Sequence, residues 1–283
     1  MSNLVSVIIP CFNDGQFLLE AVQSVQHYPD PRAYEIVVVN DGSCDPLTMQ
    51  VLADVERENC RVIHQPNRGL GAARNAGIRS ASGIYILPLD SDNRIRPEYI
   101  SEGTRVLEQN PRIGVAYGDA EYFGDKTGRW KVPKFSLGRL IQENYIDACA
   151  VFRRSAWEEV GGYDEQMPIM GWEDWDFWLR LALGNWGFCH LDAVLFDYRS
   201  RGKSMIFETV KHVGELCDYI FGKEQLKDAL ALRERQQKIA RLMTLEQSLE
   251  YRLGRAVLNP LRRFNWLLKR IAVRARDATV ASK

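Results

Sequence analysis

The chain has 283 residues, which is enough for one large domain with its own hydrophobic core and a small addition to it. Its composition is 46% hydrophobic and 26% charged, which excludes the collagen-like, disordered and disulfide-scaffold classes. The formal net charge is zero, but residues 251–276 hold eight Arg or Lys and no Asp or Glu. The rest of the chain is therefore acidic. Because nucleic-acid-binding proteins are usually basic through their main domain, we expect no nucleic-acid partner.

Cysteine usage and apolar runs indicate where the protein works. None of the six cysteines forms a CxxC pair, and scattered thiols of this kind are typical of a reducing compartment. The apolar run Val5–Ile9 ends at Pro10, which is too short for a secretory signal, and no apolar stretch reaches the length of a membrane span. We therefore expect a cytoplasmic protein, with the inner face of the membrane as a second location.

Short apolar strands and amphipathic helices alternate through the first 118 residues. The predicted helices are Gln16–Gln26, Leu47–Arg57 after the start signal Asp45-Pro46, Gly69–Ser80, and Pro97 to about Gln109. The predicted strands are Leu4–Ile9, Glu35–Val39, Arg61–His64, Ile84–Leu89 and Ile113–Tyr117. This alternation predicts an α/β fold with a mostly parallel sheet and helices on both faces.

After Gly118 the alternation stops. Residues 119–135 are rich in Gly, Lys and aromatic side chains, which indicates a hairpin or a loop, and Ala148–Phe152 is another candidate strand. Glu173–Leu183 is a predicted helix, and the pattern is helical from Phe207 onward. We expect an α/β domain at residues 1–205, with halves 1–118 and 119–205, and a helical extension at residues 206–283.

Polar clusters follow three of the predicted strands. They are residues 10–14 after the first strand, 40–43 after the second and 90–93 after the fourth. In an open α/β sheet the carboxyl ends of the strands line the ligand crevice, so the three clusters should meet in one site. An acidic site of this kind needs a cation or a ligand rich in hydroxyl groups.

Asp90-Ser91-Asp92 is the sharpest of these clusters. Two carboxylates one residue apart can share a divalent ion with the oxygens of a diphosphate, and Mg²⁺ or Mn²⁺ prefers such ligands. The ion would stabilise the charge that develops on a departing diphosphate. A turn in which the two Asp side chains only cap the backbone is the alternative.

Taken together, the motifs resemble those of a family 2 glycosyltransferase with the GT-A fold, a nucleotide-diphospho-sugar transferase fold. The resemblance covers residues 4–205. It rests on Val7–Pro10 with Phe12-Asn13, on Val37–Ser43 with Asn40 where many members have Asp, on Asn67–Gly77, on Leu89–Asp92, on Gly161–Glu165 and on Trp172–Asp176.

The resemblance implies an inverting transferase that moves a sugar from a nucleotide-sugar donor, with UDP favoured, to a saccharide or lipid-linked saccharide in polysaccharide or glycan assembly. Asp174 would be the general base, with Glu173 as the fallback, and Asp92 would hold Mn²⁺ or Mg²⁺. The nucleotide-sugar would be bordered by Pro10, Phe12, Asn13, Asp41 at the base, Arg74, Asp90 at the ribose, and Ser91.

Two further positions concern the acceptor and the diphosphate. Trp172 could stack on a sugar ring, whereas Trp175 and Trp178 are expected in the core. Arg201 stands where many family members have a His that binds the metal; Arg cannot do so, but it could neutralise the diphosphate. His190 is a candidate replacement, although a structural role is the stronger expectation.

The sequence allows three other functions to be considered as alternatives. Gly69-Leu70-Gly71 suggests a dinucleotide fingerprint, but it follows the third strand and Arg74 replaces the last glycine. A sugar nucleotidyltransferase should have a Gly-rich loop after the first strand, which Pro10–Gly15 lacks. A non-catalytic nucleotide-binding scaffold is the third alternative.

Residues 251–276 form a basic amphipathic pattern that could lie on an anionic membrane surface as a peripheral contact. The alternatives are packing against the α/β domain or against a second subunit. The preceding helical pattern, from about Gln225 to Leu249, could make an oligomer contact.

Overall fold

The computed structural model describes residues 5–58, 60–202 and 206–247. The chain divides into two compact units, residues 1–230 and 231–283. In the second unit the described part, 231–247, is the continuation of helix α10 (Lys227–Gln247). The basic segment 251–276, for which membrane contact was predicted, lies outside the described residues. No helix in the described ranges is both long and apolar enough to span a bilayer.

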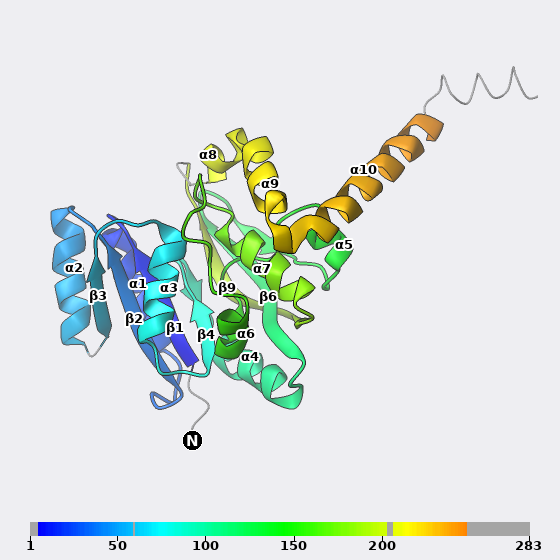
Figure 1. Cartoon of the computed structure of the whole chain (residues 1–283). Helices are drawn as coiled ribbons and strands as arrows, with labels where there is room; N and C mark the ends of the chain where they lie inside the picture. Colours follow the sequence, from blue (N-terminus) through cyan, green and yellow to red (C-terminus); the bar gives the residue numbers. More distant parts are fainter. Residues whose placement is uncertain (1–4, 59, 203–205, 248–283) are drawn as a thin grey trace, which may run out of the picture. The chain divides into compact units, whose positions relative to one another are not determined.

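A single sheet forms the centre of the first unit, and its first half is parallel (Figure 1). In the part of the chain that the structure describes, the strand order is β3-β2-β1-β4-β8-β6-β9-β5, with β7 paired to β6. The parallel strands are β1 (Val5–Cys11), β2 (Tyr34–Asp41), β3 (Arg61–Gln65) and β4 (Tyr85–Pro88). β1 and β4 are buried along their whole length, as expected of parallel strands covered on both sides.

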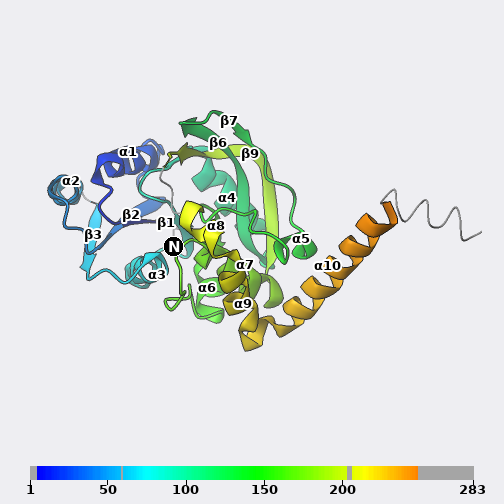
Figure 2. The ribbon, with the colours of Figure 1, turned by 90° about the horizontal axis from the view of Figure 1, so that it is seen from above.

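Helices cover both faces of this half of the sheet, as predicted (Figure 2). On one face Val7 and Ile9 of β1 share a core cluster with side chains of α1 (Gly15–Gln26), α2 (Pro46–Arg57) and α4 (Glu98–Gln109). On the other face Ile8 packs in the cluster that contains α3 (Leu70–Ser80). Successive strand residues point to opposite faces, so one apolar run supplies both cores.

The second half of the sheet is mixed, and its long strand β9 and two-residue strand β5 were missed from the sequence. β6 (Ile113–Gly124) continues beyond the predicted end at Tyr117 and forms a hairpin with β7 (Gly128–Trp130). β9 (Gly187–Ser200) runs parallel to β6. It was not predicted because its apolar residues are interrupted by polar ones and its register with β6 shifts near Asp119. The remaining strands are β5 (Arg94–Ile95) and β8 (Val151–Arg153).

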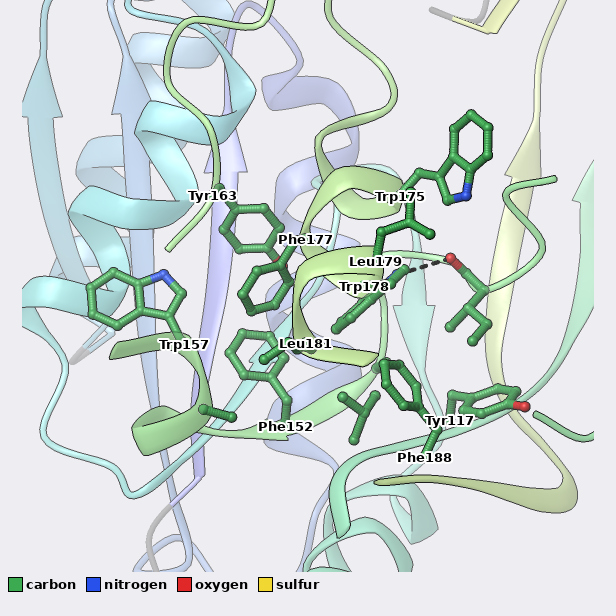
Figure 3. Close-up of a cluster of buried hydrophobic side chains, with 14 of the residues drawn as sticks. Tyr117, Phe152, Trp157, Tyr163, Trp175, Phe177, Trp178, Leu179, Leu181 and Phe188 are labelled. Carbon is green, nitrogen blue, oxygen red and sulfur yellow. Dashed lines mark hydrogen bonds between the residues drawn. The ribbon is translucent and has the colours of Figure 1, made fainter. Parts of the chain in front are cut away.

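Helix α7 (Glu173–Leu183) carries the aromatic core of the second half (Figure 3). Trp175 and Trp178 are fully buried, which confirms their predicted place in the core. Each indole N–H donates to a backbone carbonyl, Trp175 to Leu140 at 2.6 Å and Trp178 to Ile146 at 3.1 Å. These bonds tie α7 to the segment between α5 (Leu137–Leu140) and β8. The start of α7 is thereby held rigidly against the sheet.

The first compact unit continues past residue 205, where we placed the end of the α/β domain. It includes α8 (Ile206–Lys211), α9 (Val213–Gly222) and a 3-10 turn at Glu224–Leu226. Lys223 contacts Asp164 and Asp176, both on the α/β domain, at 2.5 Å. Asp176 is completely buried, and Lys223 and Arg180 together balance its charge. Within the α/β domain, the short helix α6 (Arg154–Glu159) directly follows strand β8.

Candidate active site

A cavity of about 780 Å³ opens at the carboxyl ends of β1, β2 and β4. Residues of all three predicted polar clusters line it, as expected for strand ends at one edge of a sheet, and residues of the second half join them. The structure brings together in its wall the following predicted residues: Pro10, Phe12, Asp41, Arg74, Asp90, Ser91, Asp92, Glu173, Asp174 and Arg201. Asn13, Trp172 and His190 are not among the lining residues.

Asn13 and Asp41 shape the nucleotide side of the cavity by binding backbone. The Asn13 side-chain oxygen accepts hydrogen bonds from the N–H groups of Cys44 and Asp45 at 2.9 and 3.0 Å, and Asn13 itself has a φ of 51°. Asp41 accepts from the N–H groups of Arg68 and Gly69, each at 2.9 Å. Both side chains therefore fix turns around the cavity, and Asp41 also lines it.

Arg74, which is buried, forms an ion pair with the partly exposed Asp90 in the wall of the cavity. Nη2 of Arg74 lies 2.8 Å from Oδ1 of Asp90, and Arg74 is 2% exposed. Burial alone would lower the pKa of this guanidinium. The charges of Asp90, Glu173 and Asp174 overcome that effect and raise the pKa above its usual value. Arg74 is thus a permanent positive charge among carboxylates.

Asp92 pairs with Arg201 from the end of β9. Nε of Arg201 lies 3.0 Å from Oδ2 of Asp92, and its two terminal nitrogens donate to Asp14 at 2.9 and 2.8 Å. Burial, and then the nearby charge of Asp90, raise the pKa of Asp92 to about 6, against the opposing effect of Arg201. Arg199 donates its Nε–H to the Asp92 carbonyl at 2.9 Å, which holds the turn in place.

The carboxylates of this turn fit a metal site that the substrate would complete. Within residues 5–58, 60–202 and 206–247, no group of three or more His, Cys, Asp or Glu side chains is placed to hold a metal ion. Mg²⁺ and Mn²⁺ are commonly bound by one or two carboxylates together with substrate phosphates and water. Asp92 and Asp90 offer that donor set, whereas an all-protein cage is not formed. His190 binds Asp119 at 2.9 Å and lies outside the cavity, consistent with the structural role we favoured.

Asp174 and Glu173 occupy the first turn of α7, opposite the nucleotide side. Burial raises the pKa of Asp174 to about 7, although Arg74 and a 3.0 Å hydrogen bond from the Asn144 amide oppose the shift. Burial also raises the pKa of Glu173, whose Oε2 accepts the Gly171 N–H at 2.8 Å. A carboxyl with a pKa in this range can exchange a proton near neutral pH.

Trp172 was predicted to border the acceptor, and its ring packs edge-on against Trp175 with centroids 4.9 Å apart. It is half-buried against the aromatic core. Met170 and Gly171, just before it, do line the cavity.

Comparison with known proteins agrees with this geometry. The family model for glycosyl transferase family 2 matches residues 6–161. The chain belongs to glycosyl transferase family 2. The matched residues include β1, the Asp90–Asp92 turn and β8.

Relatives of this family 2 chain are longer proteins. A chondroitin synthase of Escherichia coli is 27% identical over 211 residues, which is 71% of this chain and 29% of that protein. An uncharacterized glycosyltransferase of Rickettsia bellii is 28% identical over 193 residues, 63% of this chain and 27% of its own length. The chain therefore spans about a quarter to a third of these relatives.

A solved structure confirms the GT-A fold. The crystal structure of Staphylococcus aureus TarS 1-349 in complex with UDP-GlcNAc matches 89% of this chain and 78% of its own, with a TM-score of 0.63 and 20% identity. The predicted α/β fold class is therefore correct for this family 2 protein.

Several cavity residues were missed from the sequence. Arg199 adjoins a motif but was overlooked. Asp14 lies in the predicted cluster 10–14, but its ion pair with Arg201 could not be read from spacing. Asn144 and Asp147 precede β8 in a segment with no motif. Tyr122, Trp130 and Tyr198 lie on β6, β7 and β9, whose pairing was not predicted.

Proposed function

We propose that this family 2 protein is an inverting glycosyltransferase that moves a sugar from a UDP-sugar to a hydroxyl of a saccharide or lipid-linked saccharide. The observation that carries the proposal is Asp174, a buried carboxyl with a raised pKa in the same cavity as Arg74–Asp90 and Asp92–Arg201. The similarity to the E. coli chondroitin synthase supports a saccharide acceptor, and the similarity to TarS, solved in complex with UDP-GlcNAc, supports UDP.

The proposed reaction has one proton transfer and one displacement. Asp174 takes the proton of the acceptor hydroxyl while its oxygen attacks the anomeric carbon from the face opposite the diphosphate. The new C–O bond forms as the bond from that carbon to the phosphate oxygen breaks, and the nucleoside diphosphate leaves with its electron pair. Attack from the opposite face inverts the anomeric configuration.

The other residues of the cavity bind and orient the donor. Arg74, held by Asp90, supplies a permanent positive charge. Arg201, which pairs with Asp92, would neutralise the charge of a diphosphate bound at the Asp90–Asp92 turn. Asp41 and Phe12 border the base, and Phe12 has half of its surface exposed before any ligand binds. Asp92, with Asp90, would hold Mn²⁺ or Mg²⁺, which when bound stabilises charge on the departing diphosphate.

Two measurements test the proposal. The first is thermal unfolding of the protein with UDP, GDP, CDP or dTDP, each with and without Mn²⁺; we expect UDP with Mn²⁺ to raise the midpoint by mass action. The second is sugar transfer or donor hydrolysis by Asp174→Asn and Asp92→Asn. Asp174→Asn should keep the UDP-induced shift but lose turnover by at least about 100-fold. Asp92→Asn should lose the dependence of the shift on Mn²⁺.

Glu108→Gln, on the exposed side of α4, is the matched control and should change neither measurement. Full metal-dependent turnover by Asp92→Asn would contradict the metal assignment. Absence of a shift with every nucleotide, together with absence of turnover, would contradict the proposed function.

A further inference from the structure

One wall of the cavity has no part in the proposed reaction apart from the hydrogen bond from Asn144 to Asp174. It consists of Asp147 and Asn144, before β8, and of the rings of Trp130, Tyr122 and Tyr198. The Trp130 and Tyr122 rings are stacked, with centroids 5.8 Å apart and planes at 5°, and Tyr198 meets both edge-on. We call these five residues the sugar wall. The inference drawn from it rests on the proposed function, because it concerns the sugar of the donor.

Asp147 has acceptor capacity left for a ligand. Its Oδ1 accepts the N–H of Cys149 at 2.8 Å, a bond that fixes the carboxyl at the cavity surface. None of the ion pairs found in the described part of the chain involves Asp147. A carboxyl held in this way can receive further hydrogen bonds from ligand hydroxyl groups.

The electrostatic field around the sugar wall is negative. Asp90, Asp147 and Asp174 line the same cavity, and Arg74 is the buried cation among them. The pKa of Asp147 rises to about 8, first through burial and then through the charge of Asp90, with Asp174 adding to it and Arg74 opposing it. A further carboxylate on a ligand at this wall would meet the same repulsion.

The remaining cations of the cavity are placed elsewhere. Arg199 and Arg201 are engaged by Glu20, Asp14 and Asp92 on the other side of the Asp90–Asp92 turn. Lys126 lies on the exposed turn between β6 and β7, with its Nζ 6.0 Å from the centre of the Tyr122 ring. Among the described lining residues, Lys126 is therefore the one cation besides Arg74 that could meet a charged sugar at the sugar wall.

Two buried polar atoms beside this wall lack partners in the described residues. They are Nε of Arg74, a donor, and Oδ1 of Asn144, an acceptor. Both side chains line the cavity, and Arg74 is 2% exposed. A hydroxyl group both donates and accepts, so it matches this combination, whereas a carboxylate only accepts.

We propose that the sugar wall binds the sugar of the donor, and that Asp147 selects an uncharged hexose or N-acetylhexosamine over a hexuronic acid. Asp147 accepts hydrogen bonds from sugar hydroxyls, and the aromatic rings of the sugar wall offer an apolar surface to the C–H face of the ring. When Asp147 is ionised, its charge excludes a sugar that carries its own carboxylate.

The test compares donor affinities by titration calorimetry with Mg²⁺ at pH 9.0, above the pKa of about 8 of Asp147, so that its carboxyl is ionised. The ligands are UDP, UDP-glucose, UDP-N-acetylglucosamine and UDP-glucuronate, and the proteins are the full chain, Asp147→Asn, Lys126→Ala and the control Asp192→Asn. Asp192 is 73% exposed in its side chain and lies outside the cavity. We expect the unmodified protein to bind one of the uncharged donors at least about 10-fold more tightly than UDP-glucuronate, a difference typical of one unfavourable charge contact.

Asp147→Asn should reduce that preference to within about 3-fold, because it removes the charge while keeping the shape of the side chain. Its affinity for UDP itself should not change, which would also show that the variant is folded. Asp192→Asn should behave like the unmodified protein.

Three outcomes would overturn the inference. They are UDP-glucuronate bound as tightly as the uncharged donors, a preference unchanged in Asp147→Asn, or tight UDP-glucuronate binding that Lys126→Ala abolishes. In each of these UDP still binds, so the proposed function survives. Absence of binding by every ligand would instead overturn the donor site itself and the inference with it.

Discussion

Arg201 lies 3.0 Å from Asp92, which joins the end of β9 to the turn that follows β4. The same guanidinium holds Asp14, at the end of the turn after β1, with two hydrogen bonds. Three segments far apart in the sequence therefore meet at one cation. Because Arg cannot ligate a metal, this contact can only act by its charge and its hydrogen bonds.

Arg201→Lys should weaken donor binding more than it slows turnover. Lys keeps the charge but loses the planar group that binds Asp14 with two nitrogens and Asp92 with a third. We expect KM for the donor to rise about 10-fold with kcat changed less, as measured by initial rates over a range of UDP-sugar concentrations. Arg32→Lys, at an exposed pair with Asp30, is the control. A fall in kcat at constant KM would show that Arg201 acts on the reaction step instead.

The pH dependence of turnover should report Asp174. The base must be ionised to accept a proton, and burial raises its pKa to about 7, so kcat/KM should rise as pH increases through 7 and then level off. Asn144→Ala removes a hydrogen bond that stabilises the ionised form, so the rise should move to higher pH. Rate profiles from pH 5.5 to 9 would show both effects. If the midpoint is unchanged in Asn144→Ala, the pH profile does not report the ionisation of Asp174.

The sequence predicted the parallel half of the fold because local and global signals agree there. β1 and β2 are continuous apolar runs, and Asp45 followed by Pro46 starts α2 as expected, with the Asp45 side chain accepting the Thr48 N–H. Because these strands are parallel, their carboxyl ends lie at one edge of the sheet. The proximity of Asp41, Asp90 and Asp92 could therefore be predicted. Asp174 was predicted through the family resemblance and lies in the same cavity.

The other half could not be predicted because its contacts are non-local. β9 has only a broken apolar pattern and is held by its long pairing with β6. The partners of Arg201 and the aromatic stacking of Trp130 on Tyr122 depend on that pairing. Asp147 gave no signal either, since its environment is created by residues more than 25 positions away, such as Asp174 and Asp90.

Gly77 in α3 should be essential for packing the helix on the sheet. A Cβ at this position would lie 2.4 Å from Cγ2 of Ile8 and 3.0 Å from Cγ2 of Val39. Gly77→Ala should therefore destabilise the protein by about 1–3 kcal/mol despite the higher helix propensity of Ala. Gly214→Ala in α9, where nothing lies within 4 Å of the new Cβ, is the matched control and should stabilise by up to about 1 kcal/mol. Urea unfolding of both variants provides the comparison, and equal effects would contradict the steric argument.

Asp147 should lower the stability of the protein as pH rises. Its pKa is about 8 in the folded protein and near 3.8 in a model peptide, so between these values the folded state holds a proton that the unfolded state has lost. The free energy of unfolding contributed by this group therefore falls with increasing pH across that window. Asp147→Asn removes the titrating group while keeping an oxygen for the Cys149 N–H. This variant should leave the free energy of unfolding nearly unchanged at pH 4 and raise it by about 1–3 kcal/mol at pH 8, as measured by urea unfolding at the two pH values. The control Asp192→Asn should show no such difference between the two pH values. If Asp147→Asn has the same effect on stability at both pH values, the Asp147 carboxyl has the same pKa in the folded and the unfolded chain.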